Sequence, residues 1–182
     1  FGISQGRLTE SNELQRFPYE AWEKEFFNAE ELGIDFIELL TEREFNKKNP
    51  VWTHEGRQKI KKVCKSSRRK IFSICVDYII NHSMIDDSNR STFNHLQNVL
   101  TAASELGCKI IILPLLEESN IDEVNMEKFI PIIRDLSTFA SSYGIIICIE
   151  SLMNASNLVR LFLLLLQYAM MDCVFLEISG SS

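Results

Sequence analysis

A recurring junction of helix, glycine and strand constrains this sequence more than any other feature. Three segments end in a glycine directly before an apolar run: 29–33 before 34–38, 103–107 before 108–113, and 140–144 before 145–150. Glycine can adopt the left-handed conformation in which a helix ends before the chain turns back into a strand. Gly107 and Gly144 are 37 residues apart, and Gly33 precedes Gly107 by 74 residues, twice that spacing. A repeat of this length indicates stacked or closed copies of one strand–helix unit.

The repeated unit predicts six strands and five long helices. Apolar runs without polar alternation, as at 110–116 and 145–149, are typical of strands buried on both faces of a parallel sheet. Strands are expected at 1–5, 34–40, 70–77, 108–115, 145–151 and 172–178, and helices at 18–32, 53–67, 89–106, 126–143 and 155–169. Alternating strands and helices predict an α/β fold with right-handed crossovers.

Such units can form either an open, doubly wound sheet or a (β/α) barrel. The sequence lacks the glycine fingerprints of the phosphate-binding loop and of the dinucleotide-binding turn. Polar residues instead recur where successive strands are expected to end: Gln5, Glu38, Asp77, Glu150 and Glu177. Because a barrel collects its active-site residues at the carboxyl ends of its strands, we expect a TIM barrel of the (β/α)8 type.

The length bears on how much of that barrel is present. The chain has 182 residues, whereas a complete barrel usually takes about 250. We therefore expect one domain over residues 1–182 with about six strand–helix units, its C-terminal units missing. At 46% hydrophobic residues the chain is too apolar for disorder.

Composition also narrows the class of partner. The net charge of −6 argues against a dedicated partner among nucleic acids or anionic membranes. The five cysteines show no zinc spacing, which favours reduced core thiols in a cytoplasmic protein. The most apolar stretch, 158–171, is too short to span a bilayer, which needs about 20 apolar residues. We expect a helix buried over most of its circumference, and a homo-oligomer that covers part of it stays an open alternative.

Two glutamates are the strongest candidates for chemistry. Glu150 ends the apolar run 145–149, and Glu177 ends the next apolar run, 174–176. A carboxylate at the end of a buried strand is costly unless it is paired, protonated or bound to a metal. Two converging carboxylates offer hard oxygen ligands to a divalent cation, while the alternative is that each pairs with a basic residue on the rim.

The remaining candidates are expected to contact substrate or to be solvated at the rim. Glu38 and Asp77 can orient a sugar hydroxyl, and Gln5 follows the first strand. Arg7 can grip a phosphate bidentately or form a surface salt bridge. His82 is placed on the mouth side as a substrate contact, whereas solvation is expected for His54 and a packing or surface role for His95.

Several segments together resemble the sugar phosphate isomerase/epimerase family, a xylose-isomerase-like TIM barrel group that includes L-ribulose-5-phosphate 3-epimerase and hexulose-6-phosphate isomerases. They are residues 2–8 (GISQGRL), 29–38, 73–78, 106–114 and 149–151, and their order and spacing match along essentially the whole chain. The resemblance implies metal-assisted isomerisation or epimerisation of a phosphorylated sugar by proton transfer next to the carbonyl.

The resemblance also implies a set of metal ligands. Members of this family bind a divalent metal (Mn, Mg, Zn or Co) through residues after strands 5, 6, 7 and 8. Glu150 matches the strand-5 glutamate, a ligand that also moves the proton, and Glu177 falls at the strand-6 ligand, where most relatives have Asp. The ligands of strands 7 and 8 have no counterpart in the sequence, so a truncated, catalytically inactive barrel that acts as a binding or scaffold protein is the alternative. A third branch, the DNA-repair endonucleases, needs a row of histidine ligands and a basic groove that the sequence lacks.

Overall fold

The structure, a computed structural model, describes residues 1–10, 16–86, 88 and 90–166, and the backbone of 167 and 174–178. The strands are β1 (Gly2–Ser4), β2 (Phe36–Thr41), β3 (Lys70–Val76), β4 (Ile110–Leu115), β5 (Ile146–Ser151) and β6 (Val174–Ile178). The helices are α1 (Trp22–Glu31), α2 (His54–Ser67), α3 (Tyr78–Asn81), α4 (Ser91–Leu106), α5 (Met126–Ser142) and α6 (Ala155–Gln167), with 3-10 turns η1 (Pro50–Trp52) and η2 (Glu117–Ser119).

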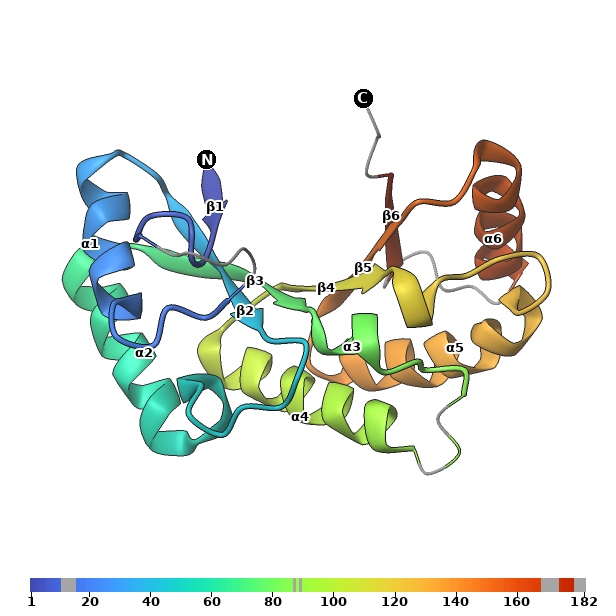
Figure 1. Ribbon diagram of the computed structural model, residues 1–182, viewed down its shortest axis with the longest axis horizontal. Helices are drawn as coiled ribbons and strands as arrows, with labels where there is room; N and C mark the ends of the chain where they lie inside the picture. The colour runs from blue at the N-terminus through green and yellow to red at the C-terminus, as the bar shows by residue number, and fades with distance from the viewer. Residues whose placement is uncertain (11–15, 87, 89, 168–173, 179–182) are drawn as a thin grey trace.

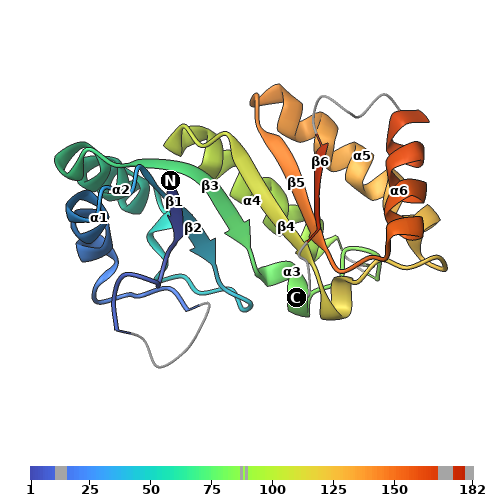
Figure 2. The same cartoon turned by 90° about the horizontal axis from the view of Figure 1, so that it is seen from above.

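The order of the strands decides between the two arrangements that the sequence left open. All neighbouring strands pair in parallel, and their order in the sheet is β1-β2-β3-β4-β5-β6, the order of the chain. A doubly wound sheet reverses its strand order at a switch point, and this sheet has none. Figure 1 shows the strands as a curved trough with the long helices around its outer side, and in Figure 2 the strands follow one another across the molecule. The fold is therefore an incomplete TIM barrel.

The junctions that set the repeat form as the sequence predicts. Gly33, Gly107 and Gly144 have φ values of 70°, 73° and 64°, so each turns the chain through the left-handed region. The spacing of 37 residues also places a fourth junction halfway between Gly33 and Gly107, near Lys70. That junction uses a different residue, because α2 ends with Arg68 in the left-handed region at φ 55°. A non-glycine residue carries a steric cost there, which explains why the glycine pattern showed a gap.

Burial alternates along the strands and separates the two faces of the sheet. In β5, Ile147 and Ile149 are fully buried, whereas Ile146, Cys148 and Glu150 are only partly buried. The fully buried positions belong to the core cluster that also contains the inward faces of the helices. The partly buried positions therefore belong to the inside of the trough, where the polar residues at the strand ends gather.

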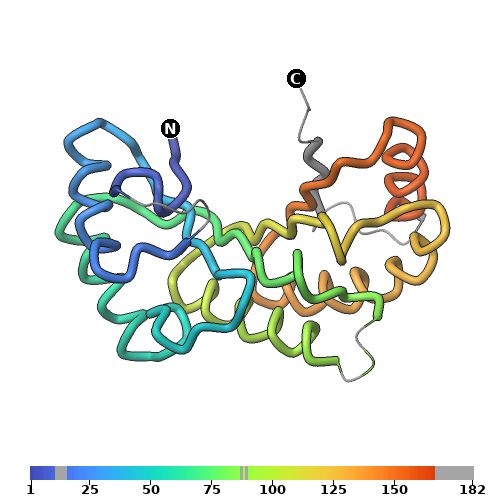
Figure 3. Tube along the Cα trace, viewed as in Figure 1, coloured from blue at the N-terminus to red at the C-terminus, as the bar shows by residue number. Residues whose placement is uncertain are grey.

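Two expectations about helices are wrong in detail. The helix expected from residue 18 begins at Trp22, because Pro18 starts a turn in which the N–H of Ala21 donates to its carbonyl at 2.9 Å. The helix α6 is buried on one face only: Leu161 and Leu165 are covered, while Val159, Phe162, Leu163 and Leu166 are exposed. Figure 3 shows the reason, since α6 lies at the outer end of the row of helices and meets a neighbouring helix on one side.

The membrane and thiol features can also be compared with the described part of the chain. Within it, no helix has the length and apolar character needed to cross a membrane. Four cysteines, Cys64, Cys75, Cys108 and Cys148, are free thiols, and Cys173 lies outside the described residues.

Candidate functional site

A polar pocket lies at the carboxyl ends of the strands, where the sequence predicts the active-site mouth. Its volume is about 200 Å³, and it is lined by Ser4, Gln5, Arg7, Glu38, Leu39, Leu40, Cys75, Asp77 and Glu150. Five of the seven predicted site residues therefore share one cavity, although they come from four different strand–loop segments. Parallel strands bring this about because their carboxyl ends all lie at the same end of the sheet.

Two pocket residues carry buried polar atoms without a partner. Gln5 is 3% exposed, and its Oε1 accepts a hydrogen bond from the N–H of Leu40 at 3.3 Å. Its Nε2 forms no hydrogen bond, and neither does Oδ2 of Asp77, which is 1% exposed. Leaving a buried donor or acceptor unpaired costs about 1–3 kcal/mol. A donor and an acceptor held unpaired in one pocket can both be satisfied by a ligand that carries hydroxyl groups.

Burial changes the acidity of Asp77. Desolvation raises the pKa of its carboxyl group, while the thiol of Cys75, whose Sγ lies 3.3 Å from Oδ1, and the charge of Arg43 act in the opposite direction. Nearby Glu38 raises that pKa further. A carboxyl group with a raised pKa can exchange a proton with a ligand more readily near neutral pH than a solvated one.

Glu38 has a different environment from the one expected of a residue that ends a strand. It is the third residue of β2, and its carboxylate accepts hydrogen bonds from Ser4 at 2.9 Å and Ser73 at 2.6 Å. These two serines belong to β1 and β3, so Glu38 joins three neighbouring strands on the inner face. Glu38 therefore holds the wall of the pocket that it lines.

Arg7 does not form the surface salt bridge that was one of its two expected roles. Its side chain is exposed and lines the pocket, and it forms no ion pair or hydrogen bond with any residue in the described part of the chain. Arg43, which follows β2, instead forms a bidentate pair with Glu117 at 2.9 and 3.0 Å.

Glu150 and Glu177 occupy paired positions on neighbouring strands. The Cα of Glu150 is the register partner of the Cα of Glu177, while the side chain of Glu177 lies outside the described residues. The two carboxylates have the ligand chemistry that a divalent cation requires, because hard cations prefer oxygen ligands. They are too few for a complete site, since no three Asp, Glu, His or Cys side chains among the described residues converge as a metal site.

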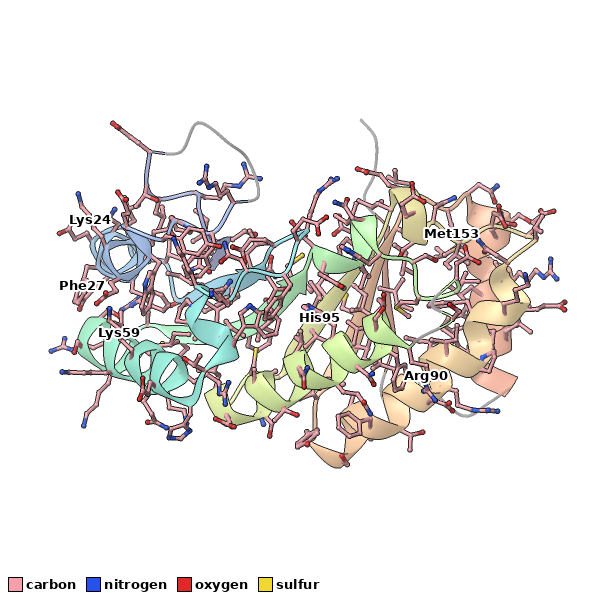
Figure 4. All side chains as sticks on the ribbon, turned by 60° about the horizontal axis from the view of Figure 1, so that its bottom comes forward. Lys24, Phe27, Lys59, Arg90, His95 and Met153 are labelled. Atoms are coloured by element: carbon pink, nitrogen blue, oxygen red, sulfur yellow. The ribbon has the colours of Figure 1, made fainter. Side chains whose placement is uncertain are left out.

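The histidines do not line the pocket. The ring of His82 stacks on Tyr78 with centroids 3.9 Å apart, and His95 stacks on the same tyrosine at 3.8 Å. Figure 4 places His95 near the middle of the molecule, in agreement with its 7% exposure and its expected packing role. The side chain of His54 is 72% exposed, as expected. His82 is thus held by Tyr78 and is not among the residues that line the pocket. Tyr78 could not be predicted in this role, because its spacing carries no signal.

Comparison with known proteins identifies the fold. Residues 26–162 match the model of a family described as the xylose isomerase-like TIM barrel. No curated protein matches the sequence closely enough to count as a relative.

Three solved structures illustrate the similarity. One is a xylose isomerase-like TIM barrel protein from Mycobacterium smegmatis in complex with magnesium. It is 16% identical, with a TM-score of 0.67, and the match covers 97% of this chain and 63% of that protein's chain. A sugar phosphate isomerase/epimerase from Parabacteroides distasonis is 12% identical, with a TM-score of 0.64 and coverage of 97% and 64%. D-Psicose 3-epimerase with D-tagatose from Clostridium cellulolyticum is 12% identical, with a TM-score of 0.69 and coverage of 97% and 62%. The chain thus spans less than two thirds of the length of each of these three.

Proposed function

The chain belongs to the xylose isomerase-like TIM barrel family, and we propose that it is part of a sugar isomerase or epimerase that acts on a phosphorylated sugar. One observation carries the proposal. Glu150, Gln5 and Asp77 line one pocket at the strand ends, and Gln5 and Asp77 each carry a buried polar atom without a partner, Nε2 and Oδ2. A sugar supplies the hydroxyl and carbonyl groups that would satisfy these atoms. The names of similar solved structures, which include sugar isomerases and epimerases, support the same class.

We assign each pocket residue a role in proton transfer next to the carbonyl. Glu150 acts as the base that removes the proton from the carbon beside the carbonyl and returns it. Gln5 donates a hydrogen bond from Nε2 to a sugar oxygen, and Asp77 binds a hydroxyl through Oδ2. Arg7 contacts the phosphate with its guanidinium group. In isomerisation Glu150 returns the proton to the former carbonyl carbon. Asp77 takes the proton of the neighbouring hydroxyl and gives it to the former carbonyl oxygen, so that the carbonyl group moves by one carbon.

The metal and partner assignments remain proposals. We propose that Glu150 and Glu177 are two of the ligands of a divalent metal ion, with Mn, Mg, Zn and Co as candidates. No step above depends on the metal, because the described side chains do not complete a site for it. The net charge of −6 supports a small-molecule partner rather than nucleic acid or a membrane, and the guanidinium group of Arg7 in the pocket supports the phosphate of that partner. The free thiols support a cytoplasmic location.

Deuterium incorporation tests the proposed activity. The chain is incubated in D2O with D-fructose 6-phosphate and other phosphorylated ketoses, with each divalent metal in turn, and exchange at the carbon beside the carbonyl is followed by NMR. Glu150→Gln should slow the exchange by about 100-fold or more, the usual contribution of a general base. Glu118→Gln, an exposed glutamate near the mouth, is the matched control and should exchange at the wild-type rate.

Each result discriminates between the hypotheses. Wild-type exchange in Glu150→Gln would remove Glu150 from the reaction. If the wild-type chain exchanges no sugar with any metal, the activity is wrong for this chain, and the alternative of a binding or scaffold protein is favoured.

A further inference from the structure

A buried glutamate outside the predicted site holds the loop that carries Arg7. Glu25 lies in α1 and is 1% exposed. Both of its carboxylate oxygens accept from the N–H of Gly6 at 2.9 Å. The oxygen Oε1 also accepts from the N–H of Leu8 and from the hydroxyl of Thr9, each at 3.1 Å. No arginine or lysine in the described part of the chain forms an ion pair with this carboxylate, so the loop itself supplies its stabilisation.

The geometry of this loop leaves Arg7 little freedom. The N–H groups on either side of Arg7, those of Gly6 and Leu8, both donate to the same carboxylate. Asn28, one turn further along α1, donates from Nδ2 to the carbonyl of Leu8 at 2.8 Å. On the other side, the N–H of Gln5 donates to the carbonyl of Glu38 at 2.9 Å. The backbone of residues 5–8 is therefore fixed at both ends.

Gly6 adds a steric condition to the same loop. Its φ of 86° lies in the left-handed region, and a Cβ at this position would approach the carbonyl oxygen of Arg16 to 2.9 Å. The loop thus takes one conformation, which brings its backbone N–H groups to Glu25. Glycine adopts this conformation without a steric cost, whereas a residue with a Cβ would be strained there.

The side chain of Arg7 contrasts with those of two other arginines. Arg43 is held by Glu117 and Arg57 by Glu105, each through two hydrogen bonds. Arg7 lines the pocket and has no such partner in the described part of the chain. A guanidinium group on a fixed backbone, with its donors unused, is prepared to bind an anionic group bidentately. Fixing the backbone beforehand lowers the entropy cost of binding.

We propose that Glu25 is a positioning residue that presents Arg7 as the anion-binding group of the pocket. Glu25 does not touch the ligand, and it acts by holding the backbone on both sides of Arg7. The anion is the phosphate group of the ligand. The inference rests on the proposed function in that this phosphate belongs to a sugar, whereas binding of inorganic phosphate to Arg7 can be tested independently of it. Arg7 lies on the β1 side of the pocket and Glu150 on the β5 side, so the phosphate binds at the end of the sugar away from the base.

A binding experiment with three ligands separates these parts. Inorganic phosphate, D-fructose and D-fructose 6-phosphate are titrated into the full chain by calorimetry. Arg7→Met should weaken phosphate and D-fructose 6-phosphate by about tenfold or more, as expected for a charged hydrogen bond. Glu25→Gln should weaken the same two ligands by about five- to tenfold and change D-fructose less than twofold, because the loop loses part of its support. Glu31→Gln, an exposed glutamate on the same helix, should change none of them.

A double-mutant cycle distinguishes positioning from general loss of stability. If Glu25 acts through Arg7, then adding Glu25→Gln to Arg7→Met should weaken phosphate binding no further. Asn28→Ala loosens the same loop without removing a buried charge, so it keeps the test available if Glu25→Gln does not fold. It should weaken phosphate binding in the same direction and leave D-fructose unchanged.

The outcomes separate this inference from the proposed function. The inference is overturned if D-fructose binds and the phosphate group of D-fructose 6-phosphate adds no affinity that depends on Arg7. That result leaves the sugar site in place. Phosphate binding that depends on Arg7 and Glu25, without binding of any sugar, supports the inference and contradicts the proposed function. Equal loss of all three ligands in Glu25→Gln, or an additive double mutant, shows a structural role only.

Discussion

The ring centroids of His95 and Tyr78 lie 3.8 Å apart, and the two ring planes differ by 15°. His95 belongs to α4 and Tyr78 begins α3, so the stack joins the segment after β3 to a helix on the outer side. Burial, together with the charge of His82, lowers the pKa of His95 from 6.5 to about 4. His95 is therefore neutral in the folded protein at neutral pH.

The lowered pKa of His95 predicts a loss of stability in mild acid. Below pH 6.5 the unfolded chain binds a proton at this residue, whereas the folded protein does so only near pH 4, so the free energy of unfolding falls as the pH drops through this window. The shift corresponds to about 3 kcal/mol when complete. Urea unfolding across this range measures it. His95→Phe, which keeps a ring in the stack, should lack this part of the pH dependence, and an unchanged pH profile would contradict the assignment.

The pair of Arg43 and Glu117 predicts opposite effects for two substitutions at one position. Glu117 has a left-handed backbone with φ 48°, and its carboxylate binds Arg43 on the surface. Glu117→Gln keeps the backbone strain and weakens the ion pair, so it should destabilise by less than about 1 kcal/mol. Glu117→Gly relieves a strain of about 1 kcal/mol and should be neutral or stabilising. Thermal or urea unfolding compares the two, and a larger loss for glycine than for glutamine would argue against backbone strain.

The regular repeat made most of the fold predictable. Gly33, Gly107 and Gly144 mark the junctions because a left-handed residue favours glycine, and the strand order follows from parallel strand–helix units. The polar residues at the strand ends met in one pocket for the same reason. Gln5 and Asp77 could thus be predicted as neighbours in space although they lie 72 residues apart.

Features that depend on one particular contact could not be predicted. The sequence alone favours an exposed helix position for Glu25. It is buried because the loop that contains Gly6 folds back over it. Helical spacing over 18–32 places Leu32 on the same face as Phe26 and Ala29, which predicts that it is buried. It is 67% exposed, because α1 ends at Glu31 and the chain has already turned away. Arg68 occupies a left-handed position that only the tertiary structure imposes.

The bridge from Ser73 to Glu38 predicts unequal costs for two serine substitutions. Ser73 is buried and donates to Oε2 of Glu38 at 2.6 Å, whereas Ser4 is exposed and donates to Oε1 at 2.9 Å. Ser73→Ala should therefore destabilise by about 1–2 kcal/mol, since a hydrogen bond to a charged group is lost without replacement by water. Ser4→Ala should cost less than about 1 kcal/mol, because water can take its place. Chemical unfolding of both variants checks the order, and equal costs would show that Glu38 does not depend on this bridge.

Replacing Asp77 should raise the stability of the protein and lower its affinity for the ligand. Burial raises the pKa of its carboxyl group, so the folded state binds the proton more tightly than the unfolded chain does, and the wild-type protein loses stability as the pH rises through that pKa. Asp77→Asn has no charge to desolvate, so it should be more stable than wild type by about 1 kcal/mol or more at neutral pH. The difference should disappear as the pH falls below 3.8, the ordinary value for Asp. The same variant should bind D-fructose 6-phosphate about tenfold more weakly, because Oδ2 is lost as a charged acceptor. Urea unfolding and calorimetric titration measure the two effects, and unchanged binding in a stabilised Asp77→Asn would remove Asp77 from the site.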